Sequence, residues 1–409
     1  MTAQSPGPEA DTARPVVIVG GGFAGLTLAL KLSRATPRPG IILVEPRKHF
    51  VFLPLLYELL SGELQPWEVA PSYDNLLNNS GIAVIHDRVT AVHWTNNEVH
   101  TASGQCLAYS QLVLATGSEP NDFGVPGVKQ HALYFHSLED VTKLKQRLKD
   151  LQRRKDAVAG TSPALVIVGA GAAGVELACK LADLTEGRFS LHLIEQGDRI
   201  LPMAKAFNRE QAEACLKQHG VHCHLTTRVE AVTPNTVSLR HGDQSTVLPH
   251  QGLIWTAGNK PKRPQMNPEI APGHGRLMVD EALCSNDLPD CLVLGDLAMR
   301  SNAISNTVES SADGANTTPW PCTAQVAMQQ GEAAARTVIA LHQGQTPEPF
   351  EFRDLGEMLS LGVGKATITG LGLTLAGPLA FKLRRVTYLA RLPKLSLGLR
   401  SAGAWLLSR

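Results

Sequence analysis

At 409 residues the chain is too long for one ordinary domain, and its 43% hydrophobic content suffices for two or three buried cores. The net charge of +1 gives no general attraction for acidic partners, so the sequence predicts no nucleic-acid partner. The charge is unevenly distributed, because eight Lys or Arg and no acid follow Glu357, which leaves about −7 on the first 357 residues.

The N-terminus, the cysteines, the histidines and the hydropathy each exclude a class of protein or site. Residues 1–15 are polar, contain prolines and lack the apolar core of a secretion signal, which predicts a disordered N-terminal tail. The seven cysteines form no CxxC pair, as expected of reduced thiols inside a cell. The fourteen histidines show no ligand spacing, so no metal site is predicted. No apolar stretch is long enough for a helix to span a membrane.

The first motif is a run of β-branched residues, 16–19, that leads into the glycine turn Gly20-x-Gly22-x-x-Gly25 and an apolar helical pattern. In such a unit the first glycine allows a tight turn, the second lets the backbone approach a pyrophosphate, and the third lets the helix pack on the strand. Glu45 ends the next apolar run, where it can accept hydrogen bonds from a ribose. The unit predicts a dinucleotide site.

The following 110 residues contain shorter signals. The patterns predict an aromatic, apolar loop over 49–59, a short amphipathic helix over 67–78, strands over 82–85, 89–94 and 98–101, a buried strand over 112–117, and an exposed helix over 138–155.

The opening motif then recurs 149 residues later. The apolar run 164–168 leads into Gly169-x-Gly171-x-x-Gly174, and Glu195 ends the next apolar run, twenty-one residues past Gly174. Because the whole strand–turn–helix–strand–acid unit repeats, the sequence predicts two dinucleotide sites in one chain.

The sequence after Glu195 contains further signals. It predicts a helix over 208–220, strands over 221–225, 228–233, 236–240, 246–248 and 252–258, a late strand over 291–296 ending in Gly-Asp, a mobile polar loop over 299–321, a helix over 323–342, and a proline-containing linker into the basic C-terminus.

These motifs together resemble the flavoproteins with two dinucleotide-binding domains, and within them the type II NADH dehydrogenases. The resemblance covers residues 16–365 and implies an α/β fold with two Rossmann-like domains. It implies FAD as cofactor and NADH or NADPH as co-substrate, with a hydride passing to FAD and two electrons to a membrane quinone. The expected domains are an FAD domain of 16–135 and 285–345, an NAD(P)H domain of 136–284 and a membrane-associating segment of 346–409.

The resemblance also assigns the cofactor contacts. Glu45 would hold the ADP half of FAD, and Glu195 would bind the 2′-hydroxyl of NADH and repel the 2′-phosphate of NADPH, an effect that Gln196 and Arg199 could soften. NADH is therefore favoured. The remaining residues expected to bind the cofactors are Gly20, Gly22, Gly25, Gly295 and Asp296 for FAD, Gly169, Gly171 and Gly174 for the nicotinamide dinucleotide, and Thr116, Gly117 and Gly258 in two short glycine turns that the family has between its domains.

Four residues are expected to act near the reacting groups. Glu176, in the first turn of the second helix, corresponds to a family glutamate beside the nicotinamide and quinone sites. Gln325 and Gln329 match an AQxAxQ signature linked to quinone binding and share one helix face. Lys365 is expected to neutralise charge near the reduced flavin.

Cysteine positions separate the chain from two related groups. Glutathione-reductase-like enzymes need a cysteine pair soon after the first unit, whereas here no cysteine precedes Cys106. Sulfide:quinone reductases need cysteines in regions that correspond to 107–178 and 323–409, which contain none. Packing thiols are therefore expected.

The C-terminal segment resembles a cyanobacterial and plastid subgroup that reduces demethylphylloquinone in vitamin K1 synthesis. Its uncharged run 366–381 is too short to span a membrane, and the nearby cations favour a segment that lies on an anionic lipid surface. The resemblance thus predicts a peripheral membrane protein on the cytoplasmic face. The alternative is a helix pair packed on the core or on the partner of a homodimer.

Two other functions stay open. One is a respiratory or photosynthetic dehydrogenase that reduces plastoquinone or ubiquinone. The other is a redox-sensing flavoprotein of the apoptosis-inducing-factor type, which would turn over quinone slowly.

Overall fold

We analysed a computed structural model that describes residues 14–153, 163–270, 275–301 and 319–392, together with Gly398 and Arg400. The chain divides into two compact units. Unit 1 contains residues 1–50, 71–119 and 260–353, and unit 2 contains residues 51–70, 120–259 and 354–409. The units differ in their bounds from the expected domains. Residues 51–70 and 120–135 belong to unit 2, residues 260–284 belong to unit 1, and the chain from Asp354 onward belongs to unit 2.

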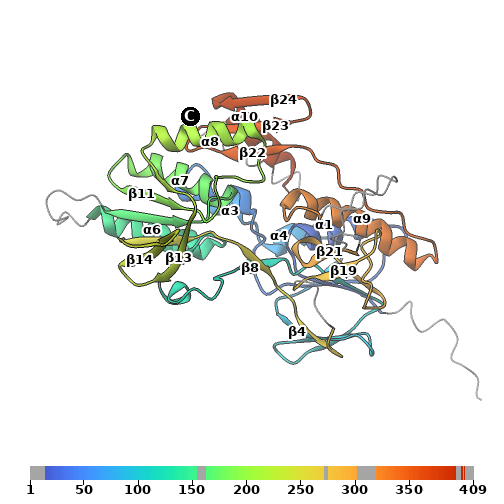
Figure 1. The fold of residues 1–409 in the computed structure, drawn as a ribbon. Coiled ribbons are helices and arrows are strands. Elements are labelled where there is room, and N and C mark those ends of the chain that lie inside the picture. The colour runs from blue at the N-terminus through green and yellow to red at the C-terminus, as the bar shows by residue number, and fades with distance from the viewer. Residues whose placement is uncertain are drawn as a thin grey trace, which may run out of the picture. The chain divides into compact units, whose positions relative to one another are not determined.

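Unit 1 is built on a five-stranded parallel sheet in the order β20-β7-β1-β2-β3. Helix α1 (Phe23–Leu32) packs against α9 (Ala324–His342) (Figure 1). A Cβ at Gly331 would lie 2.5 Å from the Ala24 carbonyl oxygen. The strands are β1 (Val16–Val19), β2 (Ile41–Val44), β3 (Ala83–Ile85), β7 (Gln111–Leu114) and β20 (Cys291–Val293).

A second sheet of unit 1 has the order β18-β4-β5-β6, and one of its faces packs in the same hydrophobic core as β1, β7 and β20. Its strands are β4 (Val89–His93), β5 (Glu98–Thr101), β6 (Cys106–Ala108) and β18 (Gln265–Asn267). The expected loop 299–321 lies mostly outside the described residues, but its first residues belong to β21 (Ala298–Arg300), which pairs with β19 (Leu277–Val279).

Unit 2 repeats the parallel arrangement with the strand order β12-β11-β10-β16-β9. These strands are β9 (Leu133–Tyr134), β10 (Ala164–Val168), β11 (Ser190–Ile194), β12 (His222–His224) and β16 (Gly252–Trp255). The helices α5 (Val128–His131), α6 (Leu138–Arg153), α7 (Ala172–Thr185) and α8 (Ala206–Gln218) accompany them, as does an antiparallel meander of β13 (Thr227–Val232), β14 (Thr236–His241) and β15 (Gln244–Pro249). The ribbon β8 (Ser118–Pro120) with β17 (Asn259–Pro261) carries the chain between the units.

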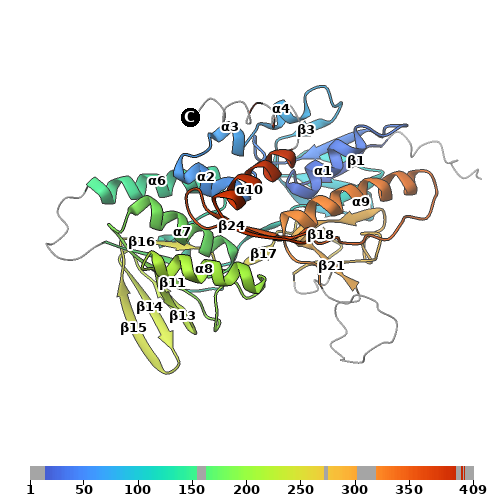
Figure 2. The same ribbon diagram turned by 90° about the horizontal axis from the view of Figure 1, so that it is seen from above.

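The C-terminal segment, which was expected to lie on a lipid surface, folds as a sheet and a helix of unit 2. Strands β22 (Glu357–Ser360), β23 (Ala366–Gly370) and β24 (Leu373–Gly377) form an antiparallel sheet, and α10 (Pro378–Ala390) packs on it (Figure 2). Part of the apolar run is therefore internal: Ala366, Ile368, Ala380 and Phe381 form a buried cluster.

The helix expected over 67–78 is also interrupted. The structure has two short helices there, α3 (Pro66–Val69) and α4 (Tyr73–Leu77), separated by residues that include Pro71. Proline disfavours helical backbone in the residue before it, so the first helix ends ahead of Pro71. The preceding segment forms η2 (Leu53–Leu55) and α2 (Leu56–Ser61) in unit 2.

Candidate functional site

The first glycine turn joins β1 to α1 in unit 1. Gly20 has a φ of +101°, and a Cβ there would overlap the Ala115 carbonyl oxygen. A Cβ at Gly25 would overlap the Gly20 carbonyl oxygen, so this position requires glycine for close packing of helix on strand. A Cβ at Gly22 would meet nothing within 4 Å, and none of the described side chains caps α1. The turn therefore offers open space and helix N–H groups to a diphosphate.

Glu45 ties the end of β2 to this turn. One carboxylate oxygen accepts the Gly21 N–H at 2.7 Å, and the other accepts the Arg47 N–H at 3.0 Å. Burial would raise the pKa of Glu45, but the hydrogen bonds and charge of Arg47, whose Nε lies 2.7 Å from Oε1, leave that pKa lowered. Tyr73 completes the support by donating its hydroxyl to the Gly21 carbonyl at 2.7 Å. A ribose hydroxyl at Glu45 would thus meet a carboxylate that is already ionised and oriented.

The second glycine turn has nearly the same geometry in unit 2. Gly169 has a φ of +100°, and a Cβ there would lie 2.8 Å from the Ala257 backbone. A Cβ at Gly174 would overlap the Gly169 carbonyl oxygen, whereas a Cβ at Gly171 would meet nothing within 4 Å. Because α7 has no side-chain cap within the described part of the chain, this turn also fits a diphosphate.

Glu195 occupies the place of Glu45, but Gly197 stands at the position where Arg47 supplies a cation to the first turn. The two carboxylate oxygens of Glu195 accept the N–H groups of Ala170 at 2.7 Å and Gly197 at 2.8 Å. Arg199, which was expected to modify this site, pairs with Asp198 at 2.9 Å. A hollow of about 380 Å³ begins at the residue next to Glu195. It is lined by Gln196, Thr226, Arg228, Arg240 and Gly242.

The two short glycine turns differ in what they anchor. The Thr116 hydroxyl donates to the Lys262 carbonyl, and Gly117 has a φ of +67°. The Thr256 hydroxyl donates to the Val168 carbonyl at 2.8 Å, and so connects its turn directly to the second glycine turn. Gly258 follows with a φ of +63°.

The Gly-Asp turn after β20 is held from α9. The Gly295 N–H donates to Gln330 Oε1 at 2.6 Å, and Asp296 accepts the Ser118 hydroxyl at 2.6 Å. Gln330 is fully buried, and its Nε2 has no hydrogen-bond partner among the described residues. This orphaned donor beside Gly295 is a position where a bound cofactor can accept a hydrogen bond. The sequence reading missed Gln330, although it directly follows the AQxAxQ signature.

The two predicted glutamines of α9 have different surroundings. Gln329 donates to the Arg353 carbonyl at 2.9 Å and accepts the Arg353 N–H at 3.0 Å, so its amide holds the segment that follows α9. Gln325 lies one turn earlier and is half-buried.

Glu176 lies inside unit 2 and contacts the C-terminal segment. Its Oε1 accepts the Ser360 N–H at 2.6 Å and lies 3.7 Å from Arg384 Nη2. Arg384 pairs with Glu58 and donates to the Pro54 carbonyl at 2.9 Å. These charged side chains are buried, and we call Glu58, Glu176 and Arg384 the Arg384 cluster.

A second buried ion pair lies on the same helix, α7. Lys180 Nζ is 2.6 Å from Glu63 and donates to the Gly362 carbonyl at 2.8 Å. Thus α7 contacts both the segment 51–70 and the turn after β22 through charged groups. Lys365, which was expected near the flavin, is an exposed residue of the turn between β22 and β23.

Burial and the neighbouring charges together set the pKa of Glu176. Burial raises the pKa of Glu176 to about 7, although Arg384 and the Ser360 N–H lower it, and Glu58 adds to the rise. Glu176 is consequently a carboxyl group that can gain or lose a proton near neutral pH, as an acid–base group requires. Tyr388 lies over Arg384, 4.7 Å from ring centre to guanidinium carbon.

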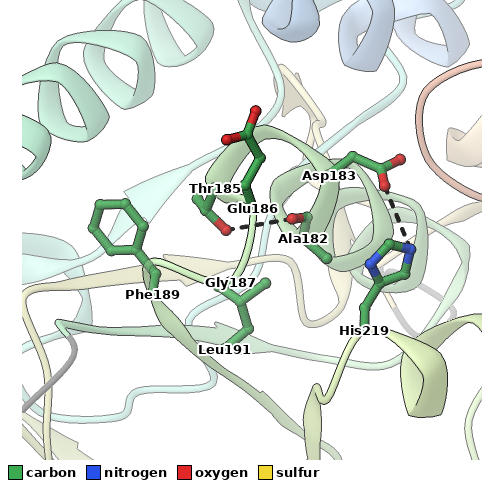
Figure 3. Close-up of a pocket in the computed structure, with 8 residues that line it drawn as sticks. All are labelled: Ala182, Asp183, Thr185, Glu186, Gly187, Phe189, Leu191 and His219. Carbon is green, nitrogen blue, oxygen red and sulfur yellow. Dashed lines mark hydrogen bonds and ion pairs between the residues drawn. The ribbon is translucent and has the colours of Figure 1, made fainter.

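A separate hollow of about 200 Å³ lies at the C-terminal end of α7, far along that helix from Gly171 (Figure 3). Asp183 faces His219 across it at 3.4 Å and accepts the Val363 N–H at 2.6 Å. This hollow is distinct from the glycine turn.

The fold and the two glycine turns, each backed by an acid, define an α/β protein with two dinucleotide-type sites. The chain belongs to the pyridine nucleotide-disulphide oxidoreductase family, whose sequence profile matches residues 14–331. This membership confirms the broad family resemblance drawn from the sequence.

Two relatives are similar over most of their length. The chain is 37% identical over 414 residues to demethylphylloquinone reductase NdbB of Synechocystis sp., covering 96% of this chain and 98% of the relative. It is 33% identical over 421 residues to alternative NAD(P)H-ubiquinone oxidoreductase C1, chloroplastic/mitochondrial, of Arabidopsis thaliana, covering 94% of this chain and 79% of the relative.

Solved structures share the fold. NDH2 from Plasmodium falciparum in complex with NADH aligns with a TM-score of 0.82 at 18% identity over 94% of this chain and 96% of that chain. The sulfide:quinone oxidoreductase from Aquifex aeolicus aligns with a TM-score of 0.75 at 17% identity over 93% and 91%. These likenesses show the arrangement of the strands and helices.

Proposed function

We propose that the protein is an FAD-dependent NAD(P)H:quinone oxidoreductase. The observation that carries the proposal is the pair of matched glycine turns, each with an open second glycine and an acid bonded to the turn. The similarity to a demethylphylloquinone reductase over 98% of that relative supports the assignment of the acceptor as a quinone.

The two turns take different dinucleotides in this proposal. The turn of unit 1, with Glu45, Asp296 and the orphaned Gln330 amide, holds FAD, and the turn of unit 2, with Glu195, receives NAD(P)H. FAD, when bound, supplies the two-electron chemistry between nicotinamide and quinone. The chain's own residues bind, orient and exchange protons.

Glu176 is the proposed proton-exchanging group, because its pKa of about 7 lets it hold or release a proton at working pH. Gln325, half-buried on α9, is a candidate for a hydrogen bond to the flavin edge or the quinone. Gln329 is proposed to act by holding Arg353 and the chain after α9.

The proposed acceptor is demethylphylloquinone, and the alternative acceptors are plastoquinone and ubiquinone. A quinone panel with purified, flavin-loaded protein and NADH separates them. We expect a higher kcat/KM for a naphthoquinone than for a benzoquinone of equal chain length. A preference for the benzoquinone would favour the electron-transport alternative, and no turnover with either would overturn the proposal.

We also propose that α10 binds a membrane surface. Leu379, Leu383 and Val386 are exposed at helical spacing, with Lys382 beside them, while Arg384 on the opposite face is buried. An apolar stripe with cations fits an interfacial helix. None of the helices in the described residues is long and apolar enough to cross a membrane.

A further inference from the structure

The sheet β18-β4-β5-β6 of unit 1 has one face in the core and one face outside it. Val92 and Val99 point to the core and are fully buried, so their neighbours along each strand point outward. The register pairs His93 with Glu98 and His100 with Cys106. Two histidines, a carboxylate and a thiol from three strands therefore share the outer face.

These side chains already lie close together. The ligand atoms of Glu98, His100 and Cys106 are all within 4.8 Å of one another, and His100 Nε2 lies 3.9 Å from Glu98 Oε2. The His93 ring stacks on His100 with ring centres 4.1 Å apart. Tetrahedral zinc, with bonds of about 2.0–2.3 Å, separates its ligand atoms by about 3.3–3.8 Å. Side-chain rotations that move atoms by about an ångström would bring Glu98, His100 and Cys106 to that spacing. The His93 ring would turn out of its stack on His100 to supply the fourth ligand atom.

We propose that His93, Glu98, His100 and Cys106 form a binding site for a divalent transition-metal ion, and that Zn²⁺ is the ion their donor set fits. Two imidazole nitrogens, one thiolate and one carboxylate are ligands that zinc takes in fourfold coordination. The carboxylate and thiolate together balance the charge of the ion.

A neighbouring strand supplies an orienting group for one ligand. Asn267 on β18 lies opposite His93, with Asn267 Nδ2 and His93 Nδ1 3.1 Å apart. With the amide turned over, the Asn267 oxygen accepts the His93 Nδ1–H and leaves Nε2 to bind the metal. Zinc-bound histidines are commonly oriented by such a contact to their other nitrogen.

Binding involves no change of oxidation state. A bond forms between the Cys106 sulfur and the metal, and the thiol proton passes to solvent.

A second group of histidines serves as an internal comparison. His192 of β11 stacks on His222 and His224 of β12, and Cys223 between them points to the other side of the sheet. This group offers imidazoles without a thiol on the same face. Cys223 is exposed, like Cys106, and so reports general thiol reactivity.

The experiment uses the full-length, flavin-loaded protein purified without a histidine tag. Zn²⁺ binding is measured by equilibrium dialysis with metal analysis, and Co²⁺ is used as a spectroscopic probe of thiolate ligation. Alkylation of each cysteine by iodoacetamide is followed by peptide mass spectrometry with and without Zn²⁺. The variants are Cys106→Ser and His100→Ala, with Cys223→Ser and His222→Ala/His224→Ala as controls, and retained flavin and circular dichroism show that each is folded.

We expect one Zn²⁺ per chain at this site and a cobalt spectrum with a thiolate band. Zinc at ten times its dissociation constant should slow alkylation of Cys106 about tenfold and leave Cys223 unchanged. Since loss of an orienting contact alone weakens metal sites 10–100-fold, loss of a ligand should weaken zinc binding by about 100-fold. The proposal is overturned if Cys106→Ser or His100→Ala binds zinc like the wild type, or if only His222→Ala/His224→Ala abolishes binding.

Discussion

Glu176 shows how far a side chain's setting can depart from its position in a motif. It lies near the start of α7, shortly after the glycine turn, yet its hydrogen bond is to Ser360, 184 residues away. Burial against β22 and Arg384 leaves this carboxyl group with a pKa of about 7. The motif identified the residue, and the C-terminal segment determines its protonation.

The pKa of Glu176 predicts a pH-dependent stability. The folded pKa of about 7 exceeds the ordinary value of 4.5, so between these pH values the folded state binds the extra proton. The protonated Glu176 carboxyl therefore stabilises the folded state at low pH. This contribution to the free energy of unfolding is lost as the pH rises to about 7, by on the order of 2–3 kcal/mol. Between pH 4.5 and about 7, the free energy of unfolding of the wild type should fall relative to that of Glu176→Gln, which carries no titratable group at this position. Glu210→Gln on α8 is the exposed control, and a pH-independent difference for Glu176→Gln would contradict the assignment.

Arg384 should be essential to the stability of unit 2. Its removal leaves Glu58 and Glu176 buried without their cation, which costs about 3–5 kcal/mol. Arg384→Met should lower the free energy of unfolding by that amount in chemical denaturation. Arg384→Lys should lower it by less, because lysine keeps the charge but lacks the planar guanidinium whose separate nitrogens bond Glu58 and the Pro54 carbonyl. Lys382→Ala, exposed on the same helix, should change stability by less than about 0.5 kcal/mol. Equal losses in the two positions would show that helix packing, rather than the ion pair, is responsible.

Glu195 should select the nucleotide donor. Glu195→Gln removes the negative charge that would repel a 2′-phosphate, and the hollow with Arg228 and Arg240 lies nearby. We expect the ratio of kcat/KM for NADPH to that for NADH to rise about tenfold, or about 1.4 kcal/mol. Glu186→Gln, at the far end of α7, is the matched control. No gain for NADPH would rule out Glu195 as the selector.

At the scale of elements, the two strand–turn–helix units separate positions that fold the chain from positions that bind a ligand. Gly25 and Gly174 have no room for a Cβ, whereas Gly22 and Gly171 face open space. The same residue type therefore serves two purposes within a single turn.

Alanine substitutions should reveal this division. Gly25→Ala and Gly174→Ala should fail to fold or unfold far more easily, because each Cβ overlaps a backbone oxygen. Gly22→Ala should fold but retain less flavin, and Gly171→Ala should keep its flavin and show a raised KM for NAD(P)H. Flavin absorbance per chain and steady-state kinetics measure these effects. If Gly22→Ala kept its flavin and raised the donor KM instead, the two cofactor assignments would have to be exchanged.

These units could be predicted because their signals are local. Strand, turn, helix and acid lie within about thirty residues, so sequence spacing reports their geometry. The contacts around them could not be predicted in this way. Gln330 reaches Gly295 across 35 residues, and Arg384 reaches Glu58 across 326, and neither pair has a local pattern. The metal-type cluster was missed because strand pairing, rather than a short motif, unites its four residues.

At the scale of the whole molecule, the C-terminal segment was the part least accessible from sequence. Its composition predicted a surface-lying region with eight cations, but the fold buries Arg384 and engages Arg385 with the Glu63 carbonyl. The apolar run is likewise divided between an internal cluster and the exposed residues of α10. Composition cannot tell these fates apart, because hydropathy is the same for a residue that faces the core and one that faces outward.

This division changes how membrane binding should be tested. Truncation after residue 360 would remove Arg384 and leave the buried Glu58 and Glu176 without their cation. Loss of co-sedimentation with membranes would then also follow from misfolding. Replacing Leu379, Leu383 and Val386 with serine removes the exposed stripe and leaves the buried face intact. Burial of one such side chain stabilises by about 1.5–3 kcal/mol, so losing even part of three should reduce binding to anionic vesicles more than tenfold. Val247→Ser, exposed on β15, is the control. Unchanged co-sedimentation of the triple variant, with flavin retained, would exclude α10 as the membrane-binding element.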